Sequence, residues 1–155
     1  LYEGGIRVPL VVRWPRVVSP ETIESTPVIS TDFFPTLLEA ASVKVPETYE
    51  GDGVSLLPLL KTEEDNFSRD SIFFHYPNYA FHRSNRLGSA IRRGDHKLIE
   101  WLDDGSFELY NLAEDLQESR DLSDEKPSLA ERMLKQLHDW RLKVDAEMPK
   151  AVSAN

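Results

Sequence analysis

The clearest hydrophobic pattern of this chain lies near its C-terminus. Apolar side chains recur at steps of 4, 4, 3 and 4 residues from Leu129 to Val144, at Leu129, Met133, Leu137, Trp140 and Val144. This spacing is typical of one face of an α-helix. Pro127 stands where a first helical residue is expected, and Pro149 ends the pattern. The sequence therefore predicts one long amphipathic helix, whose apolar face packs on the core of the chain rather than on a partner.

Short apolar segments separated by turn residues precede that helix. Four of them have the composition of strands: 71–76, 89–93, 97–102 and 107–111. Gly94-Asp95 and Asp103-Asp104-Gly105 stand between three of these segments and are typical of tight hairpin turns. We therefore expect a four-stranded antiparallel sheet packed by the long helix. Together they predict an α+β subdomain over 71–150, followed by a loose tail over 151–155.

The N-terminal part opens with a continuous apolar run, Ile6–Trp14, which is rich in β-branched residues and is closed by Pro15. Such a run predicts a strand that is buried on both faces of a larger parallel sheet. Since the chain offers few neighbours for that sheet, we expect its other strands to lie in polypeptide outside these residues. An exposed edge strand of this kind also predicts pairing with a second copy, as a homo-oligomer.

A shorter helix is predicted after a polar connection. Ser30-Thr31-Asp32 offers N-cap groups. The apolar face of this helix would carry Phe34, Leu37, Leu38 and Ala41. Leu56–Leu60 predicts a further helical turn or two. We therefore expect residues 1–60 to be the last strand and helices of a large α/β domain, joined to the C-terminal subdomain by a linker loop over 61–70.

The composition excludes several classes of protein. Of the 155 residues, 40% are apolar, which is enough for a packed core. The 27 acidic and 18 basic side chains give a net charge of −9, which argues against binding to nucleic acid or to anionic membranes. No apolar run is long enough for a transmembrane helix. Cysteine is absent, so these residues hold no disulfide, zinc–thiolate site or cysteine nucleophile.

The charge balance reverses between His75 and Lys97, where Asp95 is the only acidic residue. The cationic and imidazole side chains of this stretch are His75, His82, Arg83, Arg86, Arg92, Arg93, His96 and Lys97. Two interpretations remain open: a binding site for a small anion, or solvated charges on a loop and a hairpin.

The sequence offers no self-contained active site. Gly53-Val54-Ser55 resembles the start of a nucleophile elbow, but the final glycine and a preceding strand are missing. His75 and His82 do not make a metal site without further ligands. A hairpin turn explains Asp103-Asp104 better than a Ca²⁺ site does. We expect the chain to form the rim of a site whose centre lies elsewhere, with no metal bound by its own residues.

Several short motifs follow one another along the chain, and their order is informative. Their residues are 1–9 (Y-E-G-G-x-R-x-P), 30–38 (D-x-x-P-T-L-L), 52–60 (D-G-x-S-L-x-P-L-L), 75–77, 90–99, 108–112 and 115–122 (D-x-x-E-x-x-D-L). In this order they resemble the type I sulfatases, the formylglycine-dependent arylsulfatase family. The resemblance covers nearly the whole chain. Each segment is weak by itself, and the order makes the match specific.

The resemblance implies the C-terminal part of an alkaline-phosphatase-like fold and a hydrolase of aryl or carbohydrate sulfate esters. Such enzymes use Ca²⁺ and formylglycine. The family places its nucleophile, metal ligands and sulfate-contacting lysine ahead of the Tyr2–Gly5 motif. A missing N-terminal domain is therefore implied as partner, with a small sulfated substrate, and this chain alone is expected to hold no catalytic residue and no sulfatase activity. The family suggests periplasm or secretion, and no residue here fixes the compartment.

The residues that remain are expected to shape the substrate pocket. The substrate-binding candidates are His75, Tyr79, His82, Arg83 and Arg86. Structural candidates near the site are Glu3, Gly4, Gly5 and Arg7, of which Arg7 would pair with a carboxylate of the main domain. Two rival interpretations remain: a non-catalytic anion-binding module, and part of a phosphatase or phosphodiesterase of the same superfold.

Overall fold

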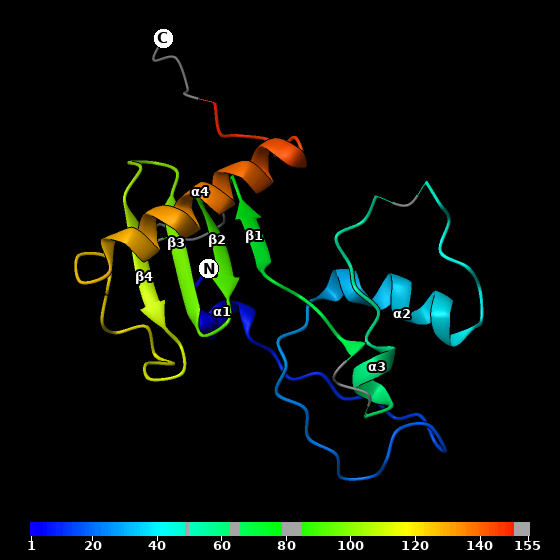
Figure 1. Ribbon diagram of the computed structural model, residues 1–155. Helices are drawn as coiled ribbons and strands as arrows, with labels where there is room; N and C mark the ends of the chain where they lie inside the picture. The colour runs from blue at the N-terminus through cyan, green and yellow to red at the C-terminus, as the bar shows by residue number, and fades with distance from the viewer. Residues whose placement is uncertain (49, 63–65, 79–84, 151–155) are drawn as a thin grey trace. The chain divides into compact units, whose positions relative to one another are not determined.

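The computed structural model describes residues 1–48, 50–62, 66–78 and 85–150, and the chain divides into two compact units (Figure 1). Unit 1 consists of Leu1–Val8 and Ser71–Asn155, and unit 2 of Pro9–Asp70. Residues 1–8 thus belong with the C-terminal unit, whereas the predicted division kept them with the following helices. Within the part of the chain that is described, no helix is long and apolar enough to cross a membrane.

Unit 1 contains the predicted sheet. Its strands are β1 (Ile72–Tyr76), β2 (Gly88–Arg93), β3 (His96–Trp101) and β4 (Phe107–Asn111), in the order β1-β2-β3-β4. Every neighbouring pair is antiparallel. The two predicted hairpin turns contain Gly94 and Gly105 at φ values of 55° and 73°, which favour glycine. The predicted antiparallel sheet is confirmed.

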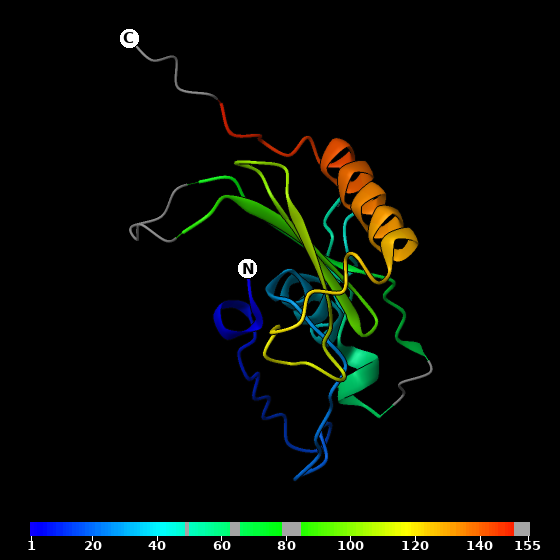
Figure 2. The ribbon, with the colours of Figure 1, turned by 90° about the vertical axis from the view of Figure 1, so that its left-hand side faces the viewer.

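Helix α4 (Pro127–Lys143) covers one face of this sheet (Figure 2). The core between helix and sheet consists of Ile91, Leu98, Leu109, Leu122, Ala130, Met133 and Leu137. At its edge, the rings of Phe73 and Trp140 stack with centroids 4.8 Å apart. The predicted helix and its packing are therefore confirmed. Because successive side chains of a strand point to opposite faces, the remaining side chains lie on the other face of the sheet.

The opposite face of the sheet carries a second core and the N-terminal segment of unit 1. Its buried members are Ala90, Ile99, Trp101, Tyr110 and Leu112, with Leu1 and Phe74 packed against them. The short helix α1 (Glu3–Ile6) lies on this side, away from α4 (Figure 2). A Cβ atom added to Gly88 would stand 2.7 Å from Leu1 Cδ1, so this glycine permits the close approach of the chain terminus.

The described residues do not form the predicted strand Ile6–Trp14. Ile6 ends α1, and residues 7–14 form neither helix nor strand. Val8 is 78% and Val11 89% exposed. A strand exists only through hydrogen bonds with a neighbouring strand, and the described residues supply none beside this segment. Pairing of two copies through this edge stays a prediction, and the described residues do not form the strand on which it is based.

Unit 2 contains a 3-10 turn, Ser30–Asp32, and the helices α2 (Phe33–Ala40) and α3 (Leu57–Leu60). The predicted helix and helical turn are both found. Two side chains of the predicted apolar face are exposed in this structure: Phe34 by 49% and Leu37 by 68%. Pro35 and Thr36 are the buried residues of this helix.

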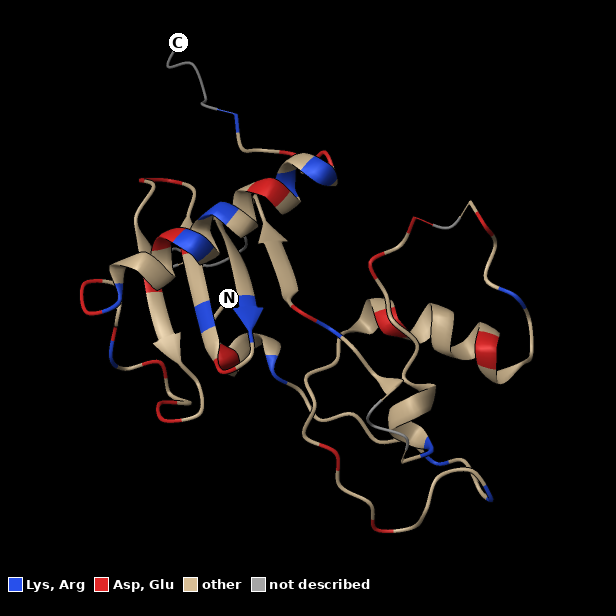
Figure 3. Cartoon of the chain, in the orientation of Figure 1, with Lys and Arg blue, Asp and Glu red and all other residues tan. Residues whose placement is uncertain are grey.

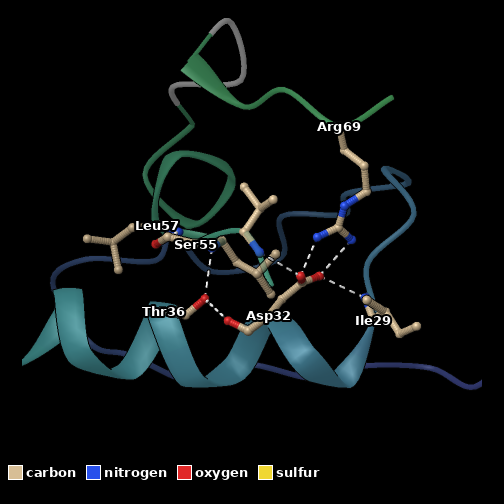
Figure 4. Close-up of polar contacts among 8 residues, drawn as sticks. Ile29, Asp32, Thr36, Ser55, Leu57 and Arg69 are labelled. Carbon is tan, nitrogen blue, oxygen red and sulfur yellow. Dashed lines mark hydrogen bonds and ion pairs between the residues drawn. The ribbon is translucent and has the colours of Figure 1, made fainter. Parts of the chain in front are cut away.

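The side chain of Asp32 makes polar contacts with several segments of unit 2 (Figure 4). It makes no capping hydrogen bond to α2, although the sequence predicts one. Its fully buried carboxylate accepts hydrogen bonds from the amides of Ile29 and Val54, at 2.8 and 3.0 Å, and pairs with both terminal nitrogens of Arg69. Burial opposes its ionisation. The Arg69 guanidinium and the two amides outweigh burial and lower the pKa of Asp32. The carboxylate thus joins three loop segments that the sequence separates.

Candidate functional site

A buried lysine joins α1 to the sheet in unit 1. Lys97, on β3, is fully buried, and its Nζ lies 2.9 Å from Glu3 Oε1 and 2.7 Å from Glu118 Oε1. The amide of Glu3 donates a 2.5 Å hydrogen bond to Glu118 Oε2, so each of the three residues contacts the other two. Arg92 Nη1 stands 4.0 Å from Glu3 Oε2. We call Lys97, Glu3 and Glu118 the Lys97 cluster. Figure 3 shows basic residues at the ends of β2 and β3 and an acidic residue in α1.

Contacts of this kind explain why α1 forms at all. A helix of four residues that contains two glycines is not stable by itself. Its backbone bonds are Gly5 N–H to Tyr2 O, at 2.8 Å, and Arg7 N–H to Glu3 O, at 2.9 Å. Tyr2 packs its ring 5.8 Å from that of Trp101. The helix is therefore held by its contacts with the sheet and not by its own propensity.

Two tyrosines share one carboxylate beside the Lys97 cluster. The hydroxyls of Tyr2 and Tyr110 donate to Glu108 Oε2 at 2.7 and 3.0 Å. Burial, followed by the hydrogen bond to Glu108, raises the pKa of Tyr2 to about 12. The same two causes raise the pKa of Tyr110. Both phenols are therefore neutral donors at ordinary pH.

An open cleft lies beside α1. It is lined by Tyr2, Glu3, Gly4, Arg7, Leu116, Gln117 and Glu118. One wall is thus the N-terminal segment, and the other is the turn that precedes α4. Three of the predicted near-site residues, Glu3, Gly4 and Arg7, lie on this cleft, and Gly5 lies next to them in α1. A Cβ added to Gly4 or Gly5 would meet no described atom within 4 Å.

His75 is part of a polar row that crosses the sheet under α4. Its Nδ1 lies 2.8 Å from Ser89 Oγ, and its Nε2 lies 2.8 Å from the carbonyl oxygen of Glu147. Since a carbonyl only accepts, Nε2 carries a proton in this arrangement. Arg141 Nη1 donates to Ser89 Oγ at 3.2 Å, and Arg141 Nη2 lies 2.7 Å from Glu100 Oε2. Both nitrogens of His75 are therefore engaged within unit 1.

Arg86 is also paired within the chain. Its Nη2 lies 2.6 Å from Asp103 Oδ1 and 2.7 Å from Asp104 Oδ2, and its guanidinium stands 4.6 Å from the centre of the Trp101 ring. The hydrogen bond from Arg86 lowers the pKa of Asp103. The other predicted substrate-binding residues, Tyr79, His82 and Arg83, lie outside the described residues.

Three cationic side chains of the stretch between residues 75 and 97 are therefore near carboxylates of the chain itself. Lys97 and Arg86 make ion pairs, and Arg92 approaches Glu3. Neither Lys97 nor Glu118 was predicted as a site residue. A signal was present, because a lysine on the inward-facing register of a strand requires a buried counter-charge. The sequence alone did not identify which carboxylate would supply it.

The described residues contain no group of three or more His, Asp or Glu side chains arranged to hold a metal ion. They also lack the groups that the family uses to make formylglycine, since cysteine is absent and no S-x-P-x-R motif occurs. The described residues therefore do not fit a Ca²⁺ site, and the sequence does not fit the precursor of formylglycine.

The fold of the chain, which includes an antiparallel sheet with a C-terminal helix on one face, is that of alkaline-phosphatase-like sulfatases, as the match to the solved structure of a 2-O GAG sulfatase shows (TM-score 0.64, 74% of this chain and 25% of that one). The crystal structure of Ps i-CgsB in complex with k-i-k-neocarrahexaose matches 92% of this chain and 30% of its own, with a TM-score of 0.70 and 25% identity. Residues 1–144 match the family described as N-sulphoglucosamine sulphohydrolase, C-terminal. The chain belongs to this family of sulfatase C-terminal domains.

Curated relatives agree with this assignment. The chain is 39% identical to a sulfatase of Formosa agariphila, in a match that covers 94% of the chain and 29% of the relative. It is 31% identical to an N-acetylglucosamine-6-O-sulfatase of Bacteroides thetaiotaomicron, over 79% of the chain and 22% of the relative. The chain thus spans less than a third of the length of these relatives.

Proposed function

We propose that this chain is the C-terminal portion of a sulfatase that hydrolyses sulfate esters, and that it supplies a wall of the substrate pocket. The observation that carries the proposal is the match of residues 1–144 to a sulfatase C-terminal family. The catalytic centre, with Ca²⁺ and formylglycine, would lie in a preceding N-terminal domain, because the residues present here do not fit those groups.

The exposed apolar side chains of unit 2 support a missing domain as partner. Phe33, Phe34 and Leu37 on α2 are 42%, 49% and 68% exposed, and the segment 9–12 exposes Leu10, Val11 and Val12. Several large apolar side chains exposed within one helix favour packing against other protein. In the proposal, the preceding sulfatase domain covers α2 and supplies the strands beside residues 8–12.

The two glycines of α1 support a close approach from outside the chain. Nothing among the described residues comes within 4 Å of a Cβ added to Gly4 or Gly5, so the fold of unit 1 does not require glycine there. Glycine in a helix is otherwise unfavourable. In the proposal, backbone of the missing domain or the substrate itself approaches this surface, and Arg7 pairs with a carboxylate of that domain.

A carbohydrate sulfate is the substrate class that the relatives favour. One relative carries N-acetylglucosamine-6-O-sulfatase in its name, and one related crystal structure contains neocarrahexaose. His75 would donate to a sugar hydroxyl or to the leaving-group oxygen once its Nε2 leaves the carbonyl of Glu147. Tyr79, His82 and Arg83 remain proposed as recognition residues. Arg86 is a weaker candidate because two aspartates already neutralise it.

The test compares the product of the whole gene with the 155-residue chain. Both are assayed on an aryl sulfate, on N-acetylglucosamine 6-sulfate and on the matching phosphate and phosphonate esters. We expect sulfate release by the whole protein and none above a heat-killed control by the chain alone. Preferential hydrolysis of the phosphorus esters, or turnover by the isolated chain, would overturn the proposal. A C-x-P-x-R or S-x-P-x-R motif upstream of Leu1 is a further expected result.

A further inference from the structure

The Lys97 cluster is an unusual way to hold a short helix. Three ionisable side chains are almost completely removed from water: side-chain exposures are 0% for Lys97, 7% for Glu3 and 2% for Glu118. Buried ion pairs contribute little net stability compared with well-packed apolar side chains, whereas they fix one geometry among many. An apolar contact would hold α1 on the sheet without fixing its orientation to the same degree.

The position of the cluster relates it to the cleft. Glu3 lies on one wall of the cleft and Glu118 on the other, and Lys97 bridges them from the sheet below. The 2.5 Å hydrogen bond from the Glu3 amide to Glu118 joins the walls directly. Glu118 has a φ of 54°, a backbone conformation that is unfavourable for residues other than glycine. The contacts with Lys97 and the Glu3 amide hold it in that conformation.

We propose that Lys97 and Glu118 are positioning residues, which set the separation of the two cleft walls and thereby the placement of Gly4 and Arg7 toward substrate. This inference rests on the proposed function, since it assigns the cleft to substrate binding. It adds two residues, from the third strand and from the turn before α4, that act on substrate only through the N-terminal segment.

The experiment uses the whole protein with Lys97→Met and, as a milder change, Glu118→Gln, which keeps an acceptor for the Glu3 amide. Hydrogen exchange of the peptide 1–8 is expected to become at least about tenfold faster, because α1 depends on these contacts. Exchange of the β3 amides should change less. In variants whose circular dichroism matches the wild type, kcat/KM for the sulfate ester should fall about 10- to 100-fold, mainly through KM.

Lys135→Met is the matched control, since Lys135 pairs with Asp139 in an exposed position of α4. It should leave both the exchange and kcat/KM unchanged. A purely structural role predicts a wild-type kcat/KM in every variant that is folded, and this result would overturn the inference. If the wild type hydrolyses no sulfate ester, the proposed function fails separately. Unchanged exchange of residues 1–8 would then still refute the role of the cluster in holding α1.

Discussion

Asp32→Asn tests how unit 2 is held together. The substitution preserves the shape of the side chain and removes its charge. The two backbone amides of Ile29 and Val54 lose an ionised acceptor, and Arg69, whose side chain is 9% exposed, loses its counter-charge. In addition, the new amide group presents a donor where the carboxylate accepted bonds on both oxygens.

The expected loss of stability follows from the contacts that the substitution removes. Removal of one partner from a buried ion pair costs about 3–5 kcal/mol, because the other charge remains buried without compensation. Hydrogen bonds to charged groups contribute about 1.5–3 kcal/mol each, and these values are not additive within one network. We therefore expect the free energy of unfolding of unit 2 to fall by about 3–5 kcal/mol.

The pH dependence gives a second measure of the same change. The folded-state pKa of Asp32 lies below its ordinary value of 3.8. A lowered carboxyl pKa contributes stability that is present above the unfolded-state value and is lost as the pH falls through the folded-state value. The wild-type unit should therefore lose stability in acid, and this component should be absent from the Asp32→Asn variant.

Native-state hydrogen exchange of the α2 and α3 amides, measured with increasing urea, reports the stability of unit 2 separately from that of the sheet. The control, Asp139→Asn, removes an exposed pair and should cost less than about 0.5 kcal/mol. A double variant with Arg69→Met should recover part of the loss. A decrease below about 1 kcal/mol, or purely additive effects in the cycle, would refute the reasoning.

Three further predictions concern other parts of the chain. Gly53→Ala should destabilise unit 2 by at least about 2 kcal/mol in thermal unfolding, because the new Cβ would stand 2.1 Å from the carbonyl oxygen of Thr31. The control, Gly4→Ala, should be neutral or slightly stabilising in the same measurement. Tyr2→Phe should remove one late transition, near pH 12, from the absorbance titration of the five tyrosines. Because the pKa of Tyr2 is raised, the stabilising contribution of its hydroxyl is complete below pH 10 and is lost as the pH rises through the folded-state value. Leu137→Ala, at a fully buried position in the core under α4, should lower the unfolding free energy of unit 1 by about 2–5 kcal/mol in urea, and a loss below 1 kcal/mol would contradict the assigned core.

Most of the secondary structure of unit 1 could be predicted because its patterns are local. The turns at Gly94 and Gly105 and the spacing from Leu129 to Val144 fix hairpins and a helix face without knowledge of distant residues. Unit 2 was less predictable. The apolar run Ile6–Trp14 has strand composition, but a strand also needs a neighbour, and the described residues provide none there.

The candidate site was predicted only in part. The order of motifs indicates the family, and it groups Glu3, Gly4 and Arg7 as near neighbours in the chain. Their lining of a cleft with Gln117 and Glu118 follows from tertiary structure. His75 and Arg86 were chosen for their charge, and their engagement with Glu147 and Asp103 could not be read from the sequence.

The sequence by itself determined the four strands of the sheet, the long helix and the family, because periodicity, turn residues and motif order are properties of neighbouring positions. Tertiary structure alone decided that Lys97 would be buried between Glu3 and Glu118, which are 94 and 21 positions away. A charged side chain enters a protein interior only where its counter-charges already converge, and such convergence arises when the sheet brings distant segments together.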